Sequence, residues 1–285
     1  IFLKILEPCD FSRGRFSMYK AVVSDLDGTL LNEEHKVSPF TKETIELLLE
    51  KGIKFYIATG RGYVGAKEIM DEIGLKIPLI TSNGARIVDE NGREIYVNNI
   101  EQKYVDKIFS IDYKSFDKGI ILNGFSGNHW YVTEDARDYF YAQKPNRKQY
   151  PEQIEQNDFE KLAFTKIFFL GEHKKLLEIE KEVRKVTNNE VNIVFVNEKS
   201  LEIFSSDCDK AVAAGFLLQR DGLTLKDAVS FGDGFNDYDL ITQTGLGFAM
   251  KNSIYRLLEK LTDTEVIGSN AEDGMARKVR EIFKI

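Results

Sequence analysis

The sequence has few cysteines, no long apolar run and no excess of positive charge. Its two cysteines, Cys9 and Cys208, lie far apart in the chain. They predict neither a disulfide framework nor a thiolate metal site, and they favour a reducing, cytoplasmic setting. No apolar run approaches the ~20 residues of a membrane span. The formal net charge of -7 argues against nucleic acid or an anionic membrane as the main partner, and no obligate protein partner is implied.

The length of 285 residues allows one large domain or two moderate ones. Hydrophobic residues make up 42% of the chain and charged residues 30%, which is the composition of an ordinary globular protein. Met18 directly precedes the first predicted strand. We therefore interpret residues 1–17 as an N-terminal extension, native or artificial, and leave them out of the fold prediction.

Two carboxylates follow the first predicted strand. Residues 19–23 form a short, largely apolar run, which is typical of a strand buried on both faces. Asp25 and Asp27 would then lie at the carboxyl end of a central parallel strand, where open α/β sheets bind ligands. Gly28 lets the backbone turn close to a ligand. The alternative is a solvated Asp-x-Asp-Gly turn, which is a common feature.

Further strands alternate with helices. The predicted strands are residues 54–58, 78–81, 228–231 and 247–250, and the predicted helices are residues 41–51, 65–73, 210–220 and 274–283. This alternation indicates βαβ units and a parallel sheet. Residues 86–97 predict a hairpin that could belong to either domain, and residues 101–198 mix helices with strands. The predicted fold is α/β, with a Rossmann-like parallel-sheet core (18–84 and 206–285) and a large inserted α+β domain (85–205).

The ends of the predicted strands supply a set of polar side chains. Besides the two acids after the first strand, they are Thr59, Asp233, Asn236 and Asp237, with Lys210 at a helix start. Hard oxygen ligands without His or Cys favour magnesium. A cation would relieve the repulsion between Asp25 and Asp27, leaving one as a nucleophile and the other as general acid and base. Thr59 and Lys210 could hold a phosphoryl group. Each feature alone has an ordinary structural explanation, but together they favour one site that binds a metal ion and a phosphoryl group.

Four segments resemble the motifs of the haloacid dehalogenase superfamily. They are residues 25–31 (DLDGTLL), 58–61 (ATGR), 209–211 (DKA) and 232–237 (GDGFND). Residues 82–85, 249–252 and 272–274 further resemble the Cof-type phosphatases, in which a large cap is inserted between the second and third motifs. The resemblance covers residues 18–285. Ala211 stands where members of the family often have glycine, and it is also small.

The resemblance implies a role for each motif residue. Asp25 would be the nucleophile that forms an aspartyl-phosphate, and Asp27 would protonate the leaving oxygen and then activate the hydrolytic water. Magnesium would be bound by Asp25, the backbone carbonyl of Asp27, Asp233 and Asp237, the last directly or through water. The phosphate would be held by Thr59, Gly60, Lys210 and Asn236, with Lys210 also pairing with Asp25. An acid at position 27 favours rapid hydrolysis over a persistent phosphoenzyme.

The resemblance also implies that the inserted cap sets the substrate. Candidate substrate contacts are Arg61 and Asn83 from the core and His129 and Lys166 from the cap, although an exposed loop histidine and a strand-start lysine are common without such a role. The predicted function is a phosphatase acting on small phosphorylated metabolites, such as sugar phosphates. The alternatives are a phosphomutase or phosphotransferase on the same fold, or a phosphate-binding regulatory module without turnover.

Overall fold

The computed structural model of the protein describes residues 19–143 and 150–285. The predicted extension, residues 1–17, and Cys9 within it lie outside the described residues. The chain forms two compact units. The first contains the described residues up to Tyr56 together with Gly215–Ile285, and the second contains Ile57–Ala214. The division crosses strand β2 and helix α7.

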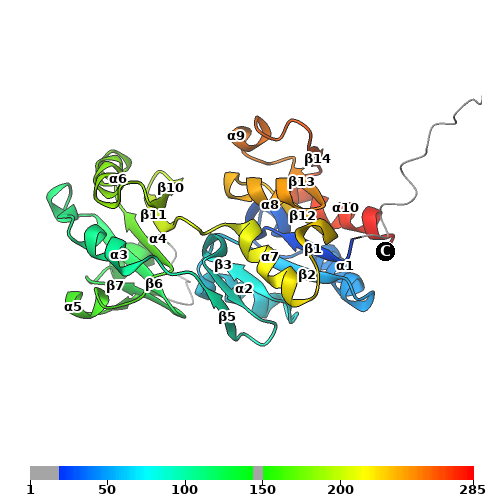
Figure 1. The fold of residues 1–285 in the computed structure, drawn as a ribbon, viewed down its shortest axis with the longest axis horizontal. Coiled ribbons are helices and arrows are strands. Elements are labelled where there is room, and N and C mark those ends of the chain that lie inside the picture. The colour runs from blue at the N-terminus through cyan, green and yellow to red at the C-terminus, as the bar shows by residue number, and fades with distance from the viewer. Residues whose placement is uncertain (1–18, 144–149) are drawn as a thin grey trace, which may run out of the picture. The chain divides into compact units, whose positions relative to one another are not determined.

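Parallel strands build the sheet of the first unit (Figure 1). They are β1 (Ala21–Ser24), β2 (Lys54–Ala58, whose last two residues belong to the second unit), β12 (Ala228–Gly232), β13 (Leu246–Met250) and β14 (Glu265–Ile267). β12 lies between β1 and β13, and β14 pairs with the other side of β13. All four residues of β1 are buried, as expected for a strand covered on both faces.

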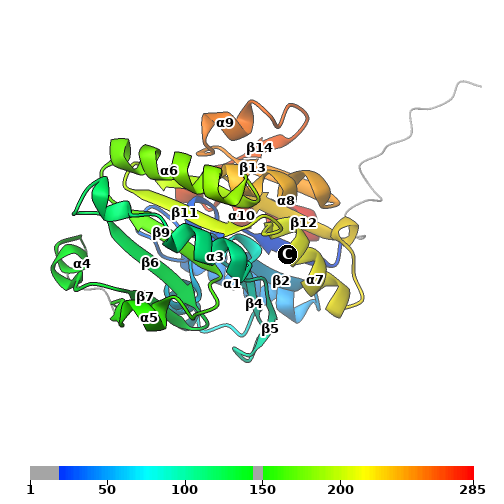
Figure 2. The ribbon, with the colours of Figure 1, turned by 60° about the vertical axis from the view of Figure 1, so that its left-hand side comes forward.

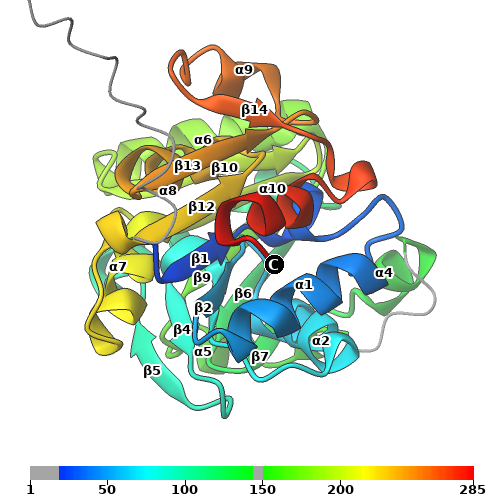
Figure 3. The ribbon, with the colours of Figure 1, turned by 90° about the vertical axis from the view of Figure 1, so that its right-hand side faces the viewer.

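Helices of the first unit pack beside these strands. They are α1 (Pro39–Glu50), α8 (Tyr238–Gln243), α9 (Tyr255–Leu258) and α10 (Gly274–Phe283), with the second half of α7 (Lys210–Arg220). The Ser38 hydroxyl accepts a hydrogen bond from the Thr41 amide at 3.0 Å, so it caps α1. Figure 3 shows α1 beside α10, where Arg280 Nε donates to Thr44 Oγ1 at 2.8 Å.

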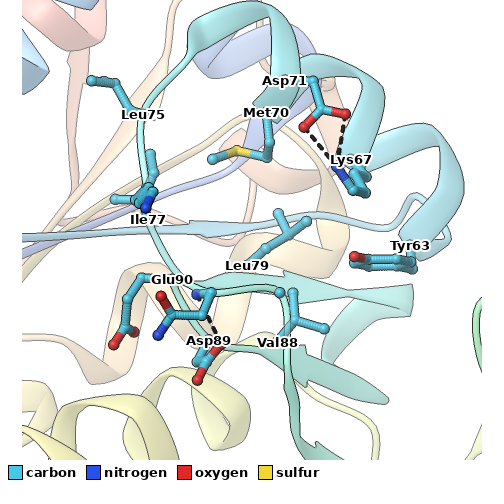
Figure 4. A pocket seen from close by; sticks show the side chains of 13 residues that line it. Tyr63, Lys67, Met70, Asp71, Leu75, Ile77, Leu79, Val88, Asp89 and Glu90 are labelled. Atoms are coloured by element: carbon cyan, nitrogen blue, oxygen red, sulfur yellow. Dashed lines mark hydrogen bonds and ion pairs between the residues drawn. The ribbon is translucent and has the colours of Figure 1, made fainter.

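The second unit begins with the end of β2 and continues into a hairpin. Its first elements are α2 (Tyr63–Ile73), β3 (Leu79–Thr81), β4 (Arg86–Val88) and β5 (Glu94–Val97). β3 is parallel to β2, whereas β4 and β5 are antiparallel. The predicted hairpin therefore pairs with β3. A cavity of about 300 Å³ lies between α2 and this hairpin. Figure 4 shows the side chains that line it, among them the exposed ion pair of Lys67 and Asp71.

The rest of the second unit is built on another sheet, with the strand order β10-β11-β9-β6-β7-β8. Its strands are β6 (Ile121–Ser126), β7 (His129–Val132), β8 (Glu152–Gln153), β9 (Lys166–Leu170), β10 (Val191–Asn197) and β11 (Ser200–Ser205). The helices of this part are α3 (Gln102–Phe109), α4 (Arg137–Gln143), α5 (Gln156–Phe159) and α6 (His173–Thr187). All neighbouring strands are antiparallel except β7 and β8.

The two faces of this sheet differ in what covers them. α3 and α6 lie on one face (Figure 2), where Ile167, Ile179 and Ile203 belong to one apolar core. On the other face Trp130 and Phe168 pack with Phe140 of α4. Side chains alternate between the faces along each strand, so β9 sends Lys166 and Phe168 to this second face.

The predicted fold class is confirmed: the protein is α/β, with a parallel-strand sheet and helices together with an α+β part. The boundaries predicted for the inserted domain, 85 and 205, stay a prediction. Along the described chain, no helix is long and apolar enough to cross a membrane.

Candidate active site

Asp25 stands at the carboxyl end of β1, as the sequence predicts. Its backbone amide donates to the carbonyl of Phe231 on β12 at 3.0 Å, which continues the parallel pairing by one residue. Its backbone is extended (φ -61°, ψ 162°), and the chain leaves the sheet only after it. The residue is buried, with 5% of its surface exposed. β1 therefore fixes the place of this carboxylate.

Three predicted site carboxylates come together in the first unit. Each of Asp25, Asp233 and Asp237 contributes an oxygen, and these oxygens all lie within 4.8 Å of one another. Asp25 and Asp237 are buried and Asp233 is partly exposed. Like charges this close in a poorly hydrated place repel strongly, so a cation between them would be stabilising. Oxygen-only donors of this kind fit a hard divalent cation such as Mg²⁺.

The loop after β12 holds two of these acids by backbone hydrogen bonds. One oxygen of Asp237 accepts from the amides of Asp233 and Gly234, at 3.0 and 2.9 Å. Gly232 allows this tight turn, because a Cβ there would lie 2.3 Å from Cβ of Asp237. The carboxylate of Asp237 is therefore fixed in direction, which suits a group that binds an ion or orients its waters.

The loop after β1 lies against Asp233. Gly28 has a φ of +76°, and a Cβ on it would lie 2.3 Å from Oδ2 of Asp233. Thr29 Oγ1 donates to Oδ1 of the same carboxylate at 3.0 Å. Glycine is thus required at position 28 both by its backbone conformation and by this close approach.

Two asparagines brace this loop from elsewhere in the first unit. Nδ2 of Asn252 donates to the carbonyl of Gly28 at 2.8 Å, while its Oδ1 accepts from the amide of Asn270 at 3.0 Å. Nδ2 of Asn270 donates to the carbonyl of Leu31, also at 2.8 Å. These bonds tie both ends of residues 28–31 to the loops after β13 and β14.

The other predicted residues of the first unit are Asp27 and Asn236. Asp27 is partly exposed and follows Asp25 by two residues, and its side chain is not one of the three clustered carboxylates. The sequence-based prediction uses its backbone carbonyl for the metal, which leaves its carboxyl for proton transfer. Asn236 is exposed in the turn between Gly234 and Asp237.

The second unit contains the predicted phosphate-binding threonine. Thr59 follows β2 and is buried, with 1% of its surface exposed. Its Oγ1 accepts from the amide of Arg61 at 3.1 Å, and its carbonyl accepts from the amide of Asn83 at 3.0 Å. Gly60 lies against Asn83, since a Cβ there would meet Oδ1 of Asn83 at 2.9 Å. The loops after β2 and β3 are therefore locked together.

Lys210, the predicted phosphate-binding lysine, is the first residue of α7 and is 1% exposed. Asp209 caps this helix by accepting from the amides of Ala211 and Val212, at 2.6 and 3.1 Å. Gly84 (φ +101°) touches the same segment, because a Cβ there would lie 2.3 Å from the carbonyl oxygen of Asp209. The structure thus brings the start of α7 to the loop after β3.

The candidate substrate contacts lie in different surroundings. Arg61 and Lys166 both line one cavity of the second unit, and Lys166 is 4% exposed. His129 is exposed, stacks on Tyr131, and has its Nδ1 2.8 Å from an oxygen of Glu152. His129 is not one of the described residues that line that cavity. Of the two candidates from the predicted cap, Lys166 therefore lines this cavity and His129 does not.

Comparison with known proteins identifies the family. The family model described as haloacid dehalogenase-like hydrolase matches residues 22–279. The chain belongs to this family. A relative from Buchnera aphidicola subsp. Baizongia pistaciae, described as "putative phosphatase", is 38% identical over 269 residues, covering 93% of this chain and 99% of that protein.

Other similar proteins extend the comparison. An HMP-PP phosphatase from Yersinia pseudotuberculosis is 27% identical over 91% of this chain and 93% of its own length. The crystal structure of a haloacid dehalogenase-like hydrolase from Bacteroides thetaiotaomicron has a TM-score of 0.81 at 24% identity, covering 93% of this chain and all of that one. The predicted superfamily and the predicted enzyme class, a phosphatase of this family, are confirmed.

In this haloacid dehalogenase-like hydrolase, sequence reasoning missed several supporting residues. It gave no role to Thr29, which bonds to Asp233, or to Asn270, which bonds to the loop after β1. Both side chains lie in segments rich in turn-forming residues, where a polar residue carries little signal by itself. It also missed Glu202, the ion-pair partner of Lys166 at 2.9 Å, because the two are 36 residues apart.

Proposed function

We propose that this protein is a magnesium-dependent phosphatase that hydrolyses small phosphorylated metabolites through an aspartyl-phosphate on Asp25. The observation that carries the proposal is the meeting of Asp25, Asp233 and Asp237 at the carboxyl ends of β1 and β12, with their oxygens within 4.8 Å of one another. Membership of the hydrolase family and the phosphatase relatives support the same conclusion.

The first proposed step is nucleophilic attack on phosphorus. A carboxylate oxygen of Asp25 forms a bond to phosphorus, and the bond from phosphorus to the leaving oxygen breaks. Asp27 gives its proton to that oxygen, so the product leaves as a neutral alcohol. The burial of Asp25 at the end of a rigid strand suits this role, because phosphoryl transfer depends mainly on positioning and charge neutralisation.

The second proposed step returns Asp25 to its starting state. The carboxylate of Asp27 takes a proton from water as the water oxygen attacks phosphorus. The bond between phosphorus and Asp25 then breaks, releasing inorganic phosphate. A partly exposed carboxyl two residues from the nucleophile is placed to serve as acid in one step and base in the next.

A bound Mg²⁺ would neutralise charge on the phosphoryl oxygens and on the nucleophile. Asp25, Asp233 and Asp237 are the side chains proposed to hold it, with the backbone carbonyl of Asp27. Lys210 and Thr59 are proposed to bind phosphoryl oxygens, through an ammonium and a hydroxyl that are both almost fully buried. Gly60 and Asn236 are proposed to support the phosphate site.

We expect the substrate of this family member to be a small molecule. The relative named HMP-PP phosphatase supports a phosphorylated small molecule as the substrate class. The acidic overall charge of -7 does not favour a large polyanion. A cytoplasmic setting remains our proposal from cysteine usage.

The test is phosphate release from a panel of phosphorylated sugars, nucleotides and vitamins. We expect release by the wild-type protein with Mg²⁺, loss on addition of a chelator, and a decrease in kcat of at least about 10³-fold in Asp25→Asn. Metal-independent release, or an Asp25→Asn variant with kcat near that of the wild type, would overturn the proposal.

A further inference from the structure

Arg86, the first residue of β4, is an almost fully buried cation in the second unit, with 4% of its surface exposed. Its Nε lies 2.7 Å from Oε2 of Glu94 on the neighbouring strand β5. Its guanidinium carbon lies over the ring of Tyr63, the first residue of α2, 4.7 Å from the ring centre. The guanidinium group is thus held by a carboxylate and by an aromatic ring.

The two terminal nitrogens of Arg86 bind the turn between β6 and β7. Nη1 donates to the carbonyl of Gly127, and Nη2 donates to Oδ1 of Asn128. These two residues are the whole connection between the strands, since β6 ends at Ser126 and β7 begins at His129. Gly127 has a φ of +54°, as tight hairpin turns often require. Two bonds from one rigid group determine both the position and the direction of this turn.

The β6–β7 hairpin lies against the predicted phosphate-binding loop, residues 59–62. Phe125 is the last residue but one of β6. Its ring contacts Gly62, because a Cβ on Gly62 would meet that ring at 2.9 Å. Gly62 is the N-cap residue of α2 and ends the loop that begins with Thr59. Because interiors are closely packed, a shift of the hairpin turn would move Phe125 and disturb this loop.

The loop after β3 holds the rest of the phosphate-binding loop. The carbonyl of Thr59 accepts from the amide of Asn83 at 3.0 Å, and the carbonyl of Arg61 accepts from the amide of Ser82 at 2.8 Å. The phosphate-binding loop is therefore held by hydrogen bonds to one neighbour and bounded at Gly62 by the β6–β7 hairpin. The position of this hairpin is what Arg86 determines.

Stability alone does not account for a charged group at this place. Removing a guanidinium from water is costly, and a buried ion pair recovers little more than that cost. Apolar side chains of similar volume often hold the same segments together as firmly. A guanidinium adds direction, because its N–H donors form a rigid planar fork. Arg86 is therefore suited to fix one arrangement of α2, β5 and the β6–β7 turn.

We propose that Arg86 is a positioning residue for the phosphate-binding loop. Through the turn of residues 127–128 it fixes the β6–β7 hairpin, and the hairpin holds Phe125 against Gly62. The loop then keeps the conformation in which Thr59 binds a phosphoryl oxygen. Arg86 acts through the hairpin and does not itself bind the substrate. This inference rests on the phosphate site of the proposed function, but the affinity for inorganic phosphate can be measured without turnover.

The first measurement is the binding of inorganic phosphate to the full protein with Mg²⁺, by calorimetry. In Arg86→Met the donors are removed and most of the apolar stem is kept. Glu94 then loses its partner, but 39% of its side chain is exposed, so no buried charge is left unpaired. We expect Arg86→Met to bind phosphate about 10-fold more weakly than the wild type. Its affinity for Mg²⁺ alone should be unchanged, because the three clustered carboxylates belong to the first unit.

Arg280→Met is the matched control. Arg280 also lies over an aromatic ring, 4.1 Å from the ring centre of Phe40, and it pairs with Glu43 at 2.6 Å and donates to Thr44 at 2.8 Å. Its replacement removes the same kinds of contact, but between α1 and α10 of the first unit. We expect Arg280→Met to bind phosphate as the wild type does. A loss of affinity equal to that of Arg86→Met would overturn the inference.

The second measurement follows the hairpin itself through Trp130, the only tryptophan in the chain. Trp130 lies on β7, is 7% exposed, and donates to Asn123 at 2.9 Å. We expect acrylamide to quench its fluorescence at least about twofold more strongly in Arg86→Met than in the wild type, because the hairpin is less firmly held. Arg280→Met should be quenched as the wild type is.

A milder variant decides the question if Arg86→Met does not fold. Asn128 is exposed, and Asn128→Ala removes only one of the two bonds between Arg86 and the turn. It should change both measurements in the same direction as Arg86→Met, with phosphate affinity lowered about 3-fold. An Asn128→Ala protein that matches the wild type in both measurements would then overturn the inference.

The outcomes separate this inference from the phosphatase function. The inference is wrong if Arg86→Met binds phosphate as the wild type does, if the quenching of Trp130 is unchanged, or if the wild type binds no phosphate. Failure of the phosphatase function would appear differently. Metal-dependent release would then be absent from every phosphorylated compound, while the wild type still binds inorganic phosphate and Arg86→Met binds it more weakly.

Discussion

At the scale of single residues, the central feature of the site is a set of three carboxylates held close together. Asp25 and Asp237 are buried, and each has an oxygen within 4.8 Å of oxygens of the other and of Asp233. Three carboxylates in this arrangement are costly without a cation or a proton. Gly28 permits the arrangement, because any side chain at that position would collide with Asp233.

Gly28→Ala should therefore impair metal binding more than folding. Alanine at φ +76° is strained, and its Cβ would force Asp233 to move. Gly52→Ala is a matched control, because Gly52 has φ +74° and a Cβ on it would meet nothing within 4 Å. We expect both variants to lose about 1 kcal/mol of stability, and only Gly28→Ala to bind Mg²⁺ at least about 10-fold more weakly. Equal Mg²⁺ affinities, measured by calorimetry, would contradict this account of Gly28.

Cys208 should be an unreactive thiol. Burial raises its pKa from 9.0 to about 12, against a smaller opposing effect of its hydrogen bond with the backbone of Ser205. In Cys9→Ser, we expect alkylation at pH 8 to be far slower than for a model thiol and to rise only above pH 9. Because the pKa is raised in the folded state, its contribution to stability is full below pH 9 and is lost as pH rises toward 12. Rapid labelling of the folded protein at pH 8 would show that the thiol is accessible and ionised.

At the scale of elements, the site is built from loops that follow strands and are braced by other loops. Asn252 and Asn270 each donate one hydrogen bond of 2.8 Å to the loop after β1, and a bond of 3.0 Å from the amide of Asn270 to Asn252 joins the two asparagines. Asp237 holds the loop after β12 by accepting from two backbone amides. The strands fix where each loop begins and in which direction it leaves the sheet. The hydrogen bonds to the loops then hold them in one conformation, which a precisely positioned carboxylate requires.

Asn252→Ala should slow catalysis without unfolding the protein. It removes the bond to the carbonyl of Gly28 and the bond from the amide of Asn270. We expect kcat/KM to fall about 10-fold and stability to fall by no more than about 1.5 kcal/mol. Asn192→Ala is the control, since Asn192 is an exposed asparagine on β10 whose side-chain amide also donates to backbone carbonyls. An Asn252→Ala enzyme as active as Asn192→Ala would mean that the brace has no catalytic effect.

Elements with strong local patterns could be predicted from the sequence, and others could not. The helices 210–220 and 274–283 and the strand 54–58 have the predicted bounds. β11 was not predicted, because the charged Glu202 interrupts its apolar pattern. The charge that pairs with Glu202 is Lys166, which lies on β9. α3 escaped because it is short and lacks a side-chain cap at its N-terminus. The information missing for β11 is tertiary, whereas α3 lacks a strong local signal.

At the scale of the whole molecule, an acidic protein is proposed to bind an anionic substrate. With a net charge of -7, an anionic substrate needs positive charge close to it, which Lys210 and the proposed metal would supply. The meeting of Asp25, Asp233 and Asp237 could be anticipated, because the loops that carry them follow β1 and β12, which are neighbouring parallel strands. The sheet side of the cavity that Arg61 and Lys166 line could not be anticipated, because its aromatic and charged residues come from four separate strands, and no single segment of the sequence shows how these strands pair.

Magnesium should raise the melting temperature of the wild-type protein. Ligand binding to the folded state at 100 times its dissociation constant adds about 2.7 kcal/mol of stability. In Asp25→Asn the metal-free protein should melt at the same or a higher temperature than the wild type, because one repelling charge is gone, and the gain with Mg²⁺ should shrink. Scanning calorimetry with Mg²⁺ and with chelator measures both effects. A wild-type melting temperature unaffected by Mg²⁺ would argue against the three carboxylates as a metal site.

The most direct test of the central claim is to trap the phosphoryl group on Asp25. Asp27→Asn is mixed with radiolabelled acetyl phosphate and Mg²⁺, because this donor needs no protonation to leave and the variant lacks the base for the second step. The account predicts label approaching one phosphoryl group per chain after acid quench, removed by hydroxylamine and located on the peptide that contains Asp25. It predicts no label in Asp25→Asn/Asp27→Asn. Label on another residue, or equal label in the double variant, would contradict Asp25 as the nucleophile.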